Sequence, residues 1–274
     1  MLTIANFNMH AGIDGWGRPF DFVGACRDLD ADVLVLQEVW TPEDSGKDQS
    51  QGQAELIAAE LGYQVVSCTL AEAYRIVPQE GAPSTWMPRF VFADRNKSLY
   101  FDCVRPIAAA TRRSARFAAC ERGLWGIAVL VRPSVVIDDT RVVHLPTLRR
   151  DRVRRAAVVV DLTADGFPLT VVGTHMSHLH MGSSRHYRQL QHELATAARP
   201  DAVLSGDMNL WGPPVRYFLR GWHRAVRGPS WPAWRPHSQI DHILVRGTLG
   251  IVSGEVRPDA GSDHRPVRAV LSLG

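Results

Sequence analysis

One stretch constrains the fold of this chain more than any other: an apolar run that stops at a glycine and is followed by two short oxygen-bearing side chains. It reads Val-Leu-Ser-Gly-Asp-Met-Asn-Leu-Trp over residues 203–211. The pattern is typical of a buried strand that presents polar groups at its carboxyl end. Because residues i and i+2 of a strand project to the same side, Asp207 and Asn209 are predicted to converge on one small ligand. Gly206 is predicted to let that ligand approach the backbone closely.

Asp and Asn after a strand also form turns by bonding to their own backbone, so this stretch alone supports two interpretations. Other predicted strands end in similar groups: Asn8 in the run Leu2–Met9, Glu38 after Val33–Leu36, His175 after Leu169–Gly173, Asp241 at the head of the run to Val245, and Asp263 and His264 before Val267–Leu273. Glu38 taken alone also fits a solvated charge at a strand end. The prediction of a shared site therefore depends on the whole set.

The remaining pattern predicts an α/β chain. Helical spacing of apolar residues predicts helices over 19–29, 53–61 and 184–198, the second stopped by Gly62, and further strands over 126–132, 135–145 and 156–162. The region 63–122, rich in proline and aromatic residues, allows no assignment. Because the chain has no repeat, linker or low-complexity tract, residues 1–274 are predicted to form a single domain.

Composition excludes several classes of protein. No stretch approaches the roughly 18 apolar residues of a membrane helix, and the amino terminus lacks a secretory pattern, so a cytoplasmic monomer is expected. The four cysteines show no CxxC pair, which argues against both a disulfide framework and a zinc site. A net charge of +3 does not by itself indicate a nucleic-acid-binding protein.

The polar set indicates a particular chemistry. Carboxylate and amide oxygens with few sulfur ligands suit Mg²⁺, with Mn²⁺ as a substitute, rather than zinc. His175 and His264 add proton transfer and charge stabilisation near neutral pH. The other histidines after the strand predicted at 169–173 are interpreted as loop and helix-surface residues: His178, His180, His186 and His192.

Six motifs carry a family resemblance, and they span nearly the whole chain: Asn-Phe-Asn at 6–8, Leu-Gln-Glu-Val at 36–39, Gly-Thr-His at 173–175, Ser-Gly-Asp-Met-Asn at 205–209, Gln-Ile-Asp-His-Ile-Leu at 239–244 and Ser-Asp-His-Arg-Pro at 262–266. In this order they resemble the endonuclease/exonuclease/phosphatase superfamily. That group includes pancreatic-type deoxyribonucleases, apurinic-site endonucleases, neutral sphingomyelinases and inositol-polyphosphate phosphatases. The resemblance implies a four-layer α/β sandwich, in which two mixed β-sheets pack face to face with helices on the outer faces.

The resemblance also implies a metal site. Glu38 matches the principal Mg²⁺ ligand, with Asn8 beside it and Asp263 as a further ligand. His10 stands where some relatives carry an acidic ligand, which leaves a second metal position open. The catalytic tyrosine of several members has no match in the chain.

Catalytic roles are implied in the same way. Asp207 would orient or deprotonate the attacking water, and Asn209 would hold a phosphoryl oxygen. His264, paired with Asp241, would bind or protonate the phosphate, and His175 would stabilise charge on the transition state. Phosphoryl transfer needs such groups on physical grounds, because water must be positioned and negative charge offset.

For the substrate, the sequence favours a phosphodiester, with nucleic acid as one candidate, hydrolysed by an endonuclease or exonuclease. Trp231 offers a stacking surface for a base or sugar. The arginine-rich run before residue 156 fits either a phosphate contact, for which Arg155 is selected, or a charged hairpin end. A phosphomonoesterase or a lipid phosphohydrolase is the alternative, with the apolar stretch 81–92 as its lipid-facing loop. A binding module without activity is the alternative from another class.

Overall fold

The computed structural model describes residues 1–15, 17–43, 51–78, 90–92, 117–149, 151 and 153–274. Within them, one sheet has seven strands in the order β12-β13-β1-β2-β5-β3-β4, and the other has six in the order β10-β11-β9-β8-β7-β6. The first sheet contains β1 (Leu2–Asn8), β2 (Val33–Pro42), β3 (Gln64–Pro78), β4 (Phe90–Phe92), β5 (Phe117–Val131), β12 (Gly250–Val256) and β13 (Val267–Ser272). The second contains β6 (Val136–His144), β7 (Ala156–Ala164), β8 (Phe167–His175), β9 (Ala202–Asp207), β10 (His223–Arg224) and β11 (Asp241–Arg246).

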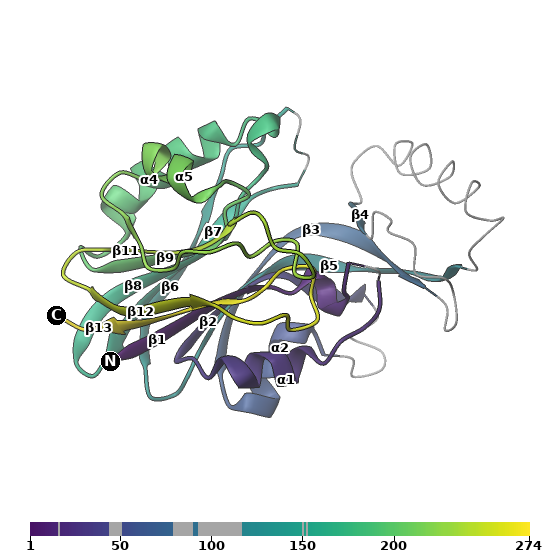
Figure 1. Ribbon diagram of the computed structural model, residues 1–274, viewed down its shortest axis with the longest axis horizontal. Helices are drawn as coiled ribbons and strands as arrows, with labels where there is room; N and C mark the ends of the chain where they lie inside the picture. Colours follow the sequence, from purple (N-terminus) through teal and green to yellow (C-terminus); the bar gives the residue numbers. More distant parts are fainter. Residues whose placement is uncertain (16, 44–50, 79–89, 93–116, 150, 152) are drawn as a thin grey trace.

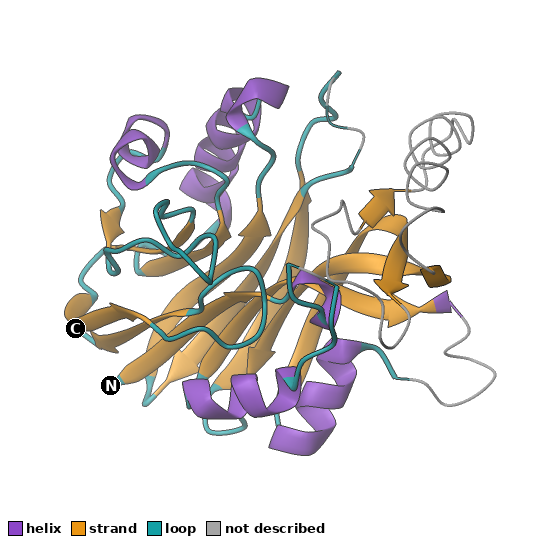
Figure 2. Ribbon diagram, turned by 45° about the vertical axis from the view of Figure 1, so that its right-hand side comes forward, coloured by secondary structure: helices purple, strands orange, loops and turns teal. Residues whose placement is uncertain are grey.

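Helices cover both outer faces of the stacked sheets (Figures 1 and 2). On one side lie α1 (Phe22–Leu29) and α2 (Gln53–Leu61), and on the other α4 (Ser184–Ala197) and α5 (Gly212–Phe218), with short 3-10 turns η1 (His10–Gly12) and η3 (Leu179–Met181) near strand ends. This confirms the predicted four-layer α/β sandwich.

The apolar run in β2 shows why the sheets stack this way. Val33 and Val35 are buried in the core between the two sheets, whereas Leu34 and Leu36 are buried against α1 and α2. All four are 0% exposed. A strand that is apolar on both faces is therefore covered on both faces, as its continuous hydrophobic pattern predicts.

Each sheet holds one parallel pair of strands among its antiparallel neighbours. These pairs are β1 with β2 and β8 with β9. The two pairs contact each other across the sandwich, through β1 with β9 and β2 with β8. Since the carboxyl ends of parallel strands meet at one edge, this packing brings four strand ends to the same edge of the molecule.

Several predicted boundaries differ from those observed. The first helix begins at Phe22 rather than Pro19, because the Asp21 carboxylate accepts a hydrogen bond from the Gly24 N–H (2.8 Å) and caps the helix there. The second helix ends at Leu61 as predicted, and Gly62 adopts a left-handed conformation (φ 74°). The unassigned region 63–122 contributes β3, β4 and the first part of β5.

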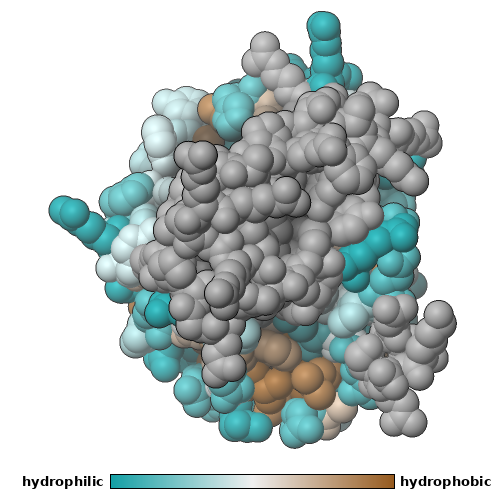
Figure 3. Space-filling model, turned by 90° about the vertical axis from the view of Figure 1, so that its right-hand side faces the viewer, coloured by the Kyte–Doolittle hydropathy of each residue, from teal (hydrophilic) through white to brown (hydrophobic). Residues whose placement is uncertain are grey.

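Other sequence expectations concern the surface and the thiols. Seen from the end shown in Figure 3, the described surface is mainly hydrophilic, with a hydrophobic patch near the lower edge of that view and smaller hydrophobic areas elsewhere. Of the stretch 81–92, only the backbone of β4 lies within the described residues. None of the described helices combines the length and apolar character that crossing a bilayer demands. Cys26 and Cys68 are free thiols, and Cys26 is buried.

Candidate active site

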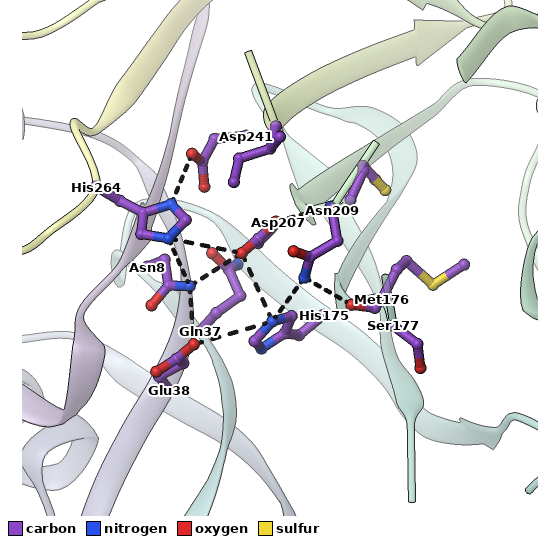
Figure 4. A network of polar contacts seen from close by, with 12 residues as sticks. Asn8, Gln37, Glu38, His175, Met176, Ser177, Asp207, Asn209, Asp241 and His264 are labelled. Atoms are coloured by element: carbon purple, nitrogen blue, oxygen red, sulfur yellow. Dashed lines mark hydrogen bonds and ion pairs between the residues drawn. The ribbon is translucent and has the colours of Figure 1, made fainter. Parts of the chain in front are cut away.

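A cavity of about 1010 Å³ opens at the edge where the two parallel strand pairs end. Its lining contains most of the residues selected from sequence: Glu38, Arg155, His175, Asp207, Asn209, Trp231, Asp263 and His264. Asn8 and Asp241 lie behind this lining and hydrogen bond to residues within it. Segments distant in sequence thus share one site, and Figure 4 shows the polar contacts among several of them.

Glu38 reaches the site because its strand is irregular. The pairing of β2 with β5 shifts register between Gln37 and Val39, and Glu38 in the resulting bulge has a left-handed backbone (φ 54°). Such a conformation costs an ordinary residue about 1–2 kcal/mol. His10 and Asn209 also have positive φ, so backbone strain concentrates around the site, a frequent feature of functional sites.

Asp207 and Asn209 converge, but not through extended backbone as the sequence pattern suggested. β9 ends at Asp207, and Asn209 turns back in a left-handed conformation, so that its N–H donates to Asp207 Oδ1 (2.8 Å). The Asn209 amide then donates to the Met176 carbonyl (2.8 Å). The alternative interpretation of the sequence, in which Asp207 and Asn209 form a turn, is therefore also correct, and this turn places both side chains in the cavity.

Gly206 has a role in strand pairing that the sequence did not indicate. A Cβ at this position would collide with the Thr174 carbonyl of the neighbouring strand β8. Gly206 is thus needed for the close parallel pairing of β8 with β9, and the close approach of a ligand to its backbone stays a prediction. This pairing sets His175 directly beside Asp207.

The side-chain amide of Asn8 joins the carboxylates of the two sheets. Its Nδ2 donates to Glu38 Oε1 and to Asp207 Oδ2, both at 3.1 Å. Its Oδ1 accepts from the His10 N–H (3.1 Å). As placed, Asn8 presents its nitrogen rather than its oxygen to Glu38, which suits a residue that holds two carboxylates at a fixed separation.

His264 lies in a ring of acids. Its Nδ1 is 2.9 Å from Asp241 Oδ2, and its Nε2 is 3.9 Å from both Asp207 Oδ2 and Asp263 Oδ1. Asp241 is held in turn by the Ser230 hydroxyl, which donates to it at 2.6 Å. Burial alone would lower the pKa of His264, but these carboxylates raise it well above its usual value. His264 is therefore an imidazolium at neutral pH.

His175 has the opposite environment. Its ring lies 5.1 Å from the ring of Trp125, and its Nε2 is 3.6 Å from Asp207 Oδ2 and 4.0 Å from Glu38 Oε1. Burial, followed by the positive charge of Arg155, lowers the pKa of His175 well below its usual value. His175 is therefore neutral.

Between the two imidazoles, Asp207 is nearly fully buried. Burial and the neighbouring Asp241 raise the pKa of Asp207 to about 7, although His264 and the hydrogen bonds from Asn209 and Asn8 oppose the change. A carboxyl with a pKa near neutrality can accept and release a proton under working conditions, which is the property required of a general base.

Asp263 and its surroundings form the side of the cavity near β13. Trp231 Nε1 donates to Asp263 Oδ2 (3.4 Å), and His10 Nδ1 lies 3.7 Å from Asp263 Oδ1. Burial would raise the pKa of Asp263, but His10 and His264 lower it overall, so this carboxylate is ionised. Trp231 thus fixes an acidic group in addition to lining the cavity.

Arg155 is not part of a charged hairpin end. It is 7% exposed, its Nε donates to Asp151 Oδ2 (3.0 Å), and its guanidinium lies 5.4 Å from the Trp125 ring centroid. Asp151 also accepts from the Ser177 hydroxyl. Arg155 Nη1 is buried without a partner within the described residues, so this guanidinium retains one donor.

The prediction that His178, His180, His186 and His192 are loop and helix-surface residues is wrong in part. His186 is 1% exposed rather than on the helix surface, and its Nε2 lies 2.7 Å from the Pro146 carbonyl. His178 and His180 line the cavity, with stacked rings 5.4 Å apart. Sequence reasoning also missed Trp125 and Ser230, because each acts through a partner that is distant in the chain.

The donor set fits a hard divalent cation. The carboxylates of Glu38, Asp207 and Asp263 line one cavity, and oxygen donors of this kind are those that Mg²⁺ prefers. Single ligand atoms of Asp207, Asp241 and His264 also lie within 4.8 Å of one another. In that second group His264 and Asp241 already bond to each other, which favours a charge pair over a coordination shell.

Two facing mixed sheets, whose strand ends join carboxylates, amides and imidazoles, define an α/β-sandwich hydrolase of phosphoesters. The sequence profile of the Endonuclease/Exonuclease/phosphatase family matches residues 5–264, and the chain belongs to this family. The family resemblance seen in the six motifs is thereby confirmed. A comparison with curated proteins found no match.

Solved structures show the same fold at low sequence identity. An endonuclease/exonuclease/phosphatase from Beutenbergia cavernae DSM 12333 is 20% identical (TM-score 0.66; 100% of this chain and 72% of that chain covered). A family protein from Bacteroides thetaiotaomicron is 16% identical (TM-score 0.67; 100% and 98% covered). The mannosyl-6-phosphatase Bt3783 of Bacteroides thetaiotaomicron VPI-5482 is 14% identical (TM-score 0.64; 99% and 100% covered).

Proposed function

We propose that this protein is a Mg²⁺-dependent phosphodiester hydrolase. The observation that carries the proposal is the position of Asp207, whose Oδ2 has a neutral imidazole 3.6 Å away on one side and an imidazolium 3.9 Å away on the other. A carboxyl whose pKa lies near neutrality can act as the base, and the two imidazoles beside it, one charged and one neutral, stabilise the charge that develops in phosphoester hydrolysis.

Glu38 and Asp263 would hold the cation, and Asn8 would keep Glu38 in place. When bound, the cation supplies positive charge to offset that of the phosphate. Mn²⁺ is expected to substitute for it.

The protein's own residues would supply the remaining chemistry. Asp207 takes the proton of the attacking water, and Asn209 donates to a phosphoryl oxygen. His264, kept cationic by Asp241, binds the phosphate or donates the proton that the leaving group needs. His175, being neutral, donates one hydrogen bond to the developing charge.

Arg155 and Trp231 would contact the substrate. Arg155 lines the cavity and its guanidinium can donate to a non-bridging phosphate oxygen, and Trp231 offers an aromatic face beside Asp263. A phosphodiester is favoured over a monoester because the cavity, about 1010 Å³, accommodates groups on both sides of the phosphorus. Phosphomonoester hydrolysis remains the competing activity, in line with the mannosyl-6-phosphatase named among the similar structures. Cytoplasmic location and a monomeric state stay predictions.

The test compares bis-p-nitrophenyl phosphate with p-nitrophenyl phosphate, a diester and a monoester that share one leaving group. With Mg²⁺ we expect the diester to be hydrolysed at least tenfold faster. Glu38→Ala should lower kcat/KM by at least about 10²-fold and weaken Mg²⁺ binding measured by calorimetry, whereas Glu60→Ala, an exposed acid on α2, should change neither. Preference for the monoester would support the phosphatase alternative, and no turnover of either would support an inactive binding module.

A further inference from the structure

The cavity is larger than a phosphate group requires. Its volume of about 1010 Å³ lies at the upper end of the range for small-molecule sites. Its lining also includes side chains that no step of phosphoester hydrolysis uses, among them Leu179, Trp211 and Ile240. Unused volume and unused apolar lining both indicate a substrate with a further group beside the phosphate.

Trp211 is the most exposed aromatic residue of that lining, with 63% of its surface accessible. Its backbone is nevertheless fixed. Leu210 before it is 5% exposed, Gly212 after it is buried, and α5 starts at once with the rigid pair Pro213-Pro214. The indole is therefore presented at the mouth of the cavity, two residues beyond Asn209, at little cost in chain entropy.

Positive charge gathers behind the same turn. The guanidinium of Arg224 packs so closely against Gly212 that a Cβ there would collide with it. Arg216 lies one helical turn beyond Gly212 on α5, and Arg227 follows Arg224 by three residues, so the three cations lie close to this turn. Burial, and then repulsion from Arg227 and Arg216, lower the pKa of Arg224. In the part of the chain that the structure describes, no carboxylate forms an ion pair with any of the three.

Arg224 is only partly satisfied by its neighbours. It donates to the Gln239 side chain, but its buried Nε has no hydrogen-bond partner among the described residues. Arg216 and Arg227 are exposed. Such a group of unneutralised arginines attracts an anion, and phosphate matches the donor geometry of guanidinium groups.

We propose that Trp211 and the cluster Arg216, Arg224 and Arg227 form a subsite for the nucleotide next to the scissile phosphate. The base stacks on the indole, and the following phosphate lies by the arginines, so the substrate is a single-stranded nucleic acid. This inference depends on the proposed phosphodiesterase function. A lipid fits less well, because the imidazoles of the cavity lining and the three arginines set charge beside the indole, where an acyl chain requires an apolar surface.

The first test uses two diesters that share a leaving group, methyl p-nitrophenyl phosphate and thymidine 5′-(p-nitrophenyl) phosphate. Trp211→Ala should lower kcat/KM for the thymidine ester by roughly 5- to 100-fold through KM, leave the methyl ester unchanged, and be rescued by Trp211→Phe. The matched control is Tyr217→Ala, an aromatic residue on α5 that is 81% exposed and lies outside the cavity lining.

Equal losses on both esters, or none, would overturn the subsite while leaving phosphodiester hydrolysis established. If neither ester reacts, the proposed function itself fails. A loss confined to sphingomyelin in phosphatidylcholine vesicles would assign Trp211 to a lipid and overturn the nucleotide assignment.

The arginine cluster is tested with a fluorescently labelled hexathymidylate. Replacing Arg216 and Arg227 by Ala should reduce the slope of log KM against log salt concentration by about 0.7 per lost phosphate contact. Arg27→Ala, an exposed arginine on α1, should leave the slope unchanged. An unaltered slope in the double variant would remove the cluster from the subsite.

Discussion

The two sides of the site place an imidazole against the same oxygen of Asp207, yet they give the two imidazoles opposite charge. On the side formed by β11 and the loop before β13, Asp241 and Asp263 keep His264 protonated. On the side formed by β5 and β8, burial against Trp125 and the charge of Arg155 keep His175 neutral. Environment, and not residue type, therefore assigns the roles, and a single buried carboxylate can work with both.

The largest expected effect tests this division directly. With Mg²⁺ at pH 7, His264→Ala should lower kcat/KM for a methyl p-nitrophenyl phosphate substrate by about 10³-fold or more, because both a charge and a proton donor are lost. His175→Ala should lower it by about 10²-fold, the effect of one hydrogen-bond donor. His223→Ala, an exposed histidine on β10, is the control. Equal losses of kcat/KM in the two variants would contradict the different roles assigned to His264 and His175.

The next largest loss of activity is expected at Asp241, the carboxylate that favours the protonated form of His264. Asp241→Asn removes the negative partner at 2.9 Å, so the pKa of His264 falls and activity is lost at lower pH than in the native protein. We expect a loss of about tenfold at pH 7 that grows as pH rises, measured as a profile of kcat/KM. An unshifted basic limb would show that His264 is not the titrating group.

The same pair predicts a pH-dependent stability. Because the folded-state pKa of His264 is raised, its contribution to stability is complete below the ordinary pKa of about 6.5. That contribution is lost as pH rises through the raised value. The melting temperature of Asp241→Asn should therefore differ more from that of the native protein at pH 6 than at pH 9. A difference in melting temperature that does not change with pH would show that the substitution destabilises the protein through packing and not through the charge of His264.

How far the sequence predicts this site depends on the range of the interactions involved. Glu38, His175 and Asp207 were predicted because each follows an apolar run, and a strand end is a local feature. The burial of Arg155 could not be predicted, since it depends on Asp151 and Trp125, which belong to other segments.

The same limit applies to the fold. The strands with continuous apolar runs, such as β2 and β9, were predicted, whereas β3 was not, because exposed, partly buried and buried positions follow no regular period over its residues 64–73. Backbone irregularities were equally hidden. The bulge that turns Glu38 into the site comes from the register of β2 with β5, and no residue type in β2 predicts it.

A direct measurement of charge would sharpen the comparison without any substitution. In the protein stripped of cations by a chelator, ¹⁵N chemical shifts of the imidazoles should show His264 protonated and His175 neutral at pH 7. His242, whose pKa burial lowers to about 4, provides an internal neutral reference. Two neutral or two protonated site histidines would contradict the assignment.

The smallest expected effect concerns His178, which lines the cavity near His175. Its positive form would lower the pKa of His175, but burial and then His180 lower the pKa of His178 itself, so at neutral pH it carries little charge. His178→Gln should therefore change kcat/KM less than about threefold at pH 7. Its effect should increase only as pH falls and the native residue becomes protonated, since repulsion of His175 then begins. A loss of more than 30-fold at pH 7 would place His178 among the reacting groups and would contradict a neutral His178 beside His175.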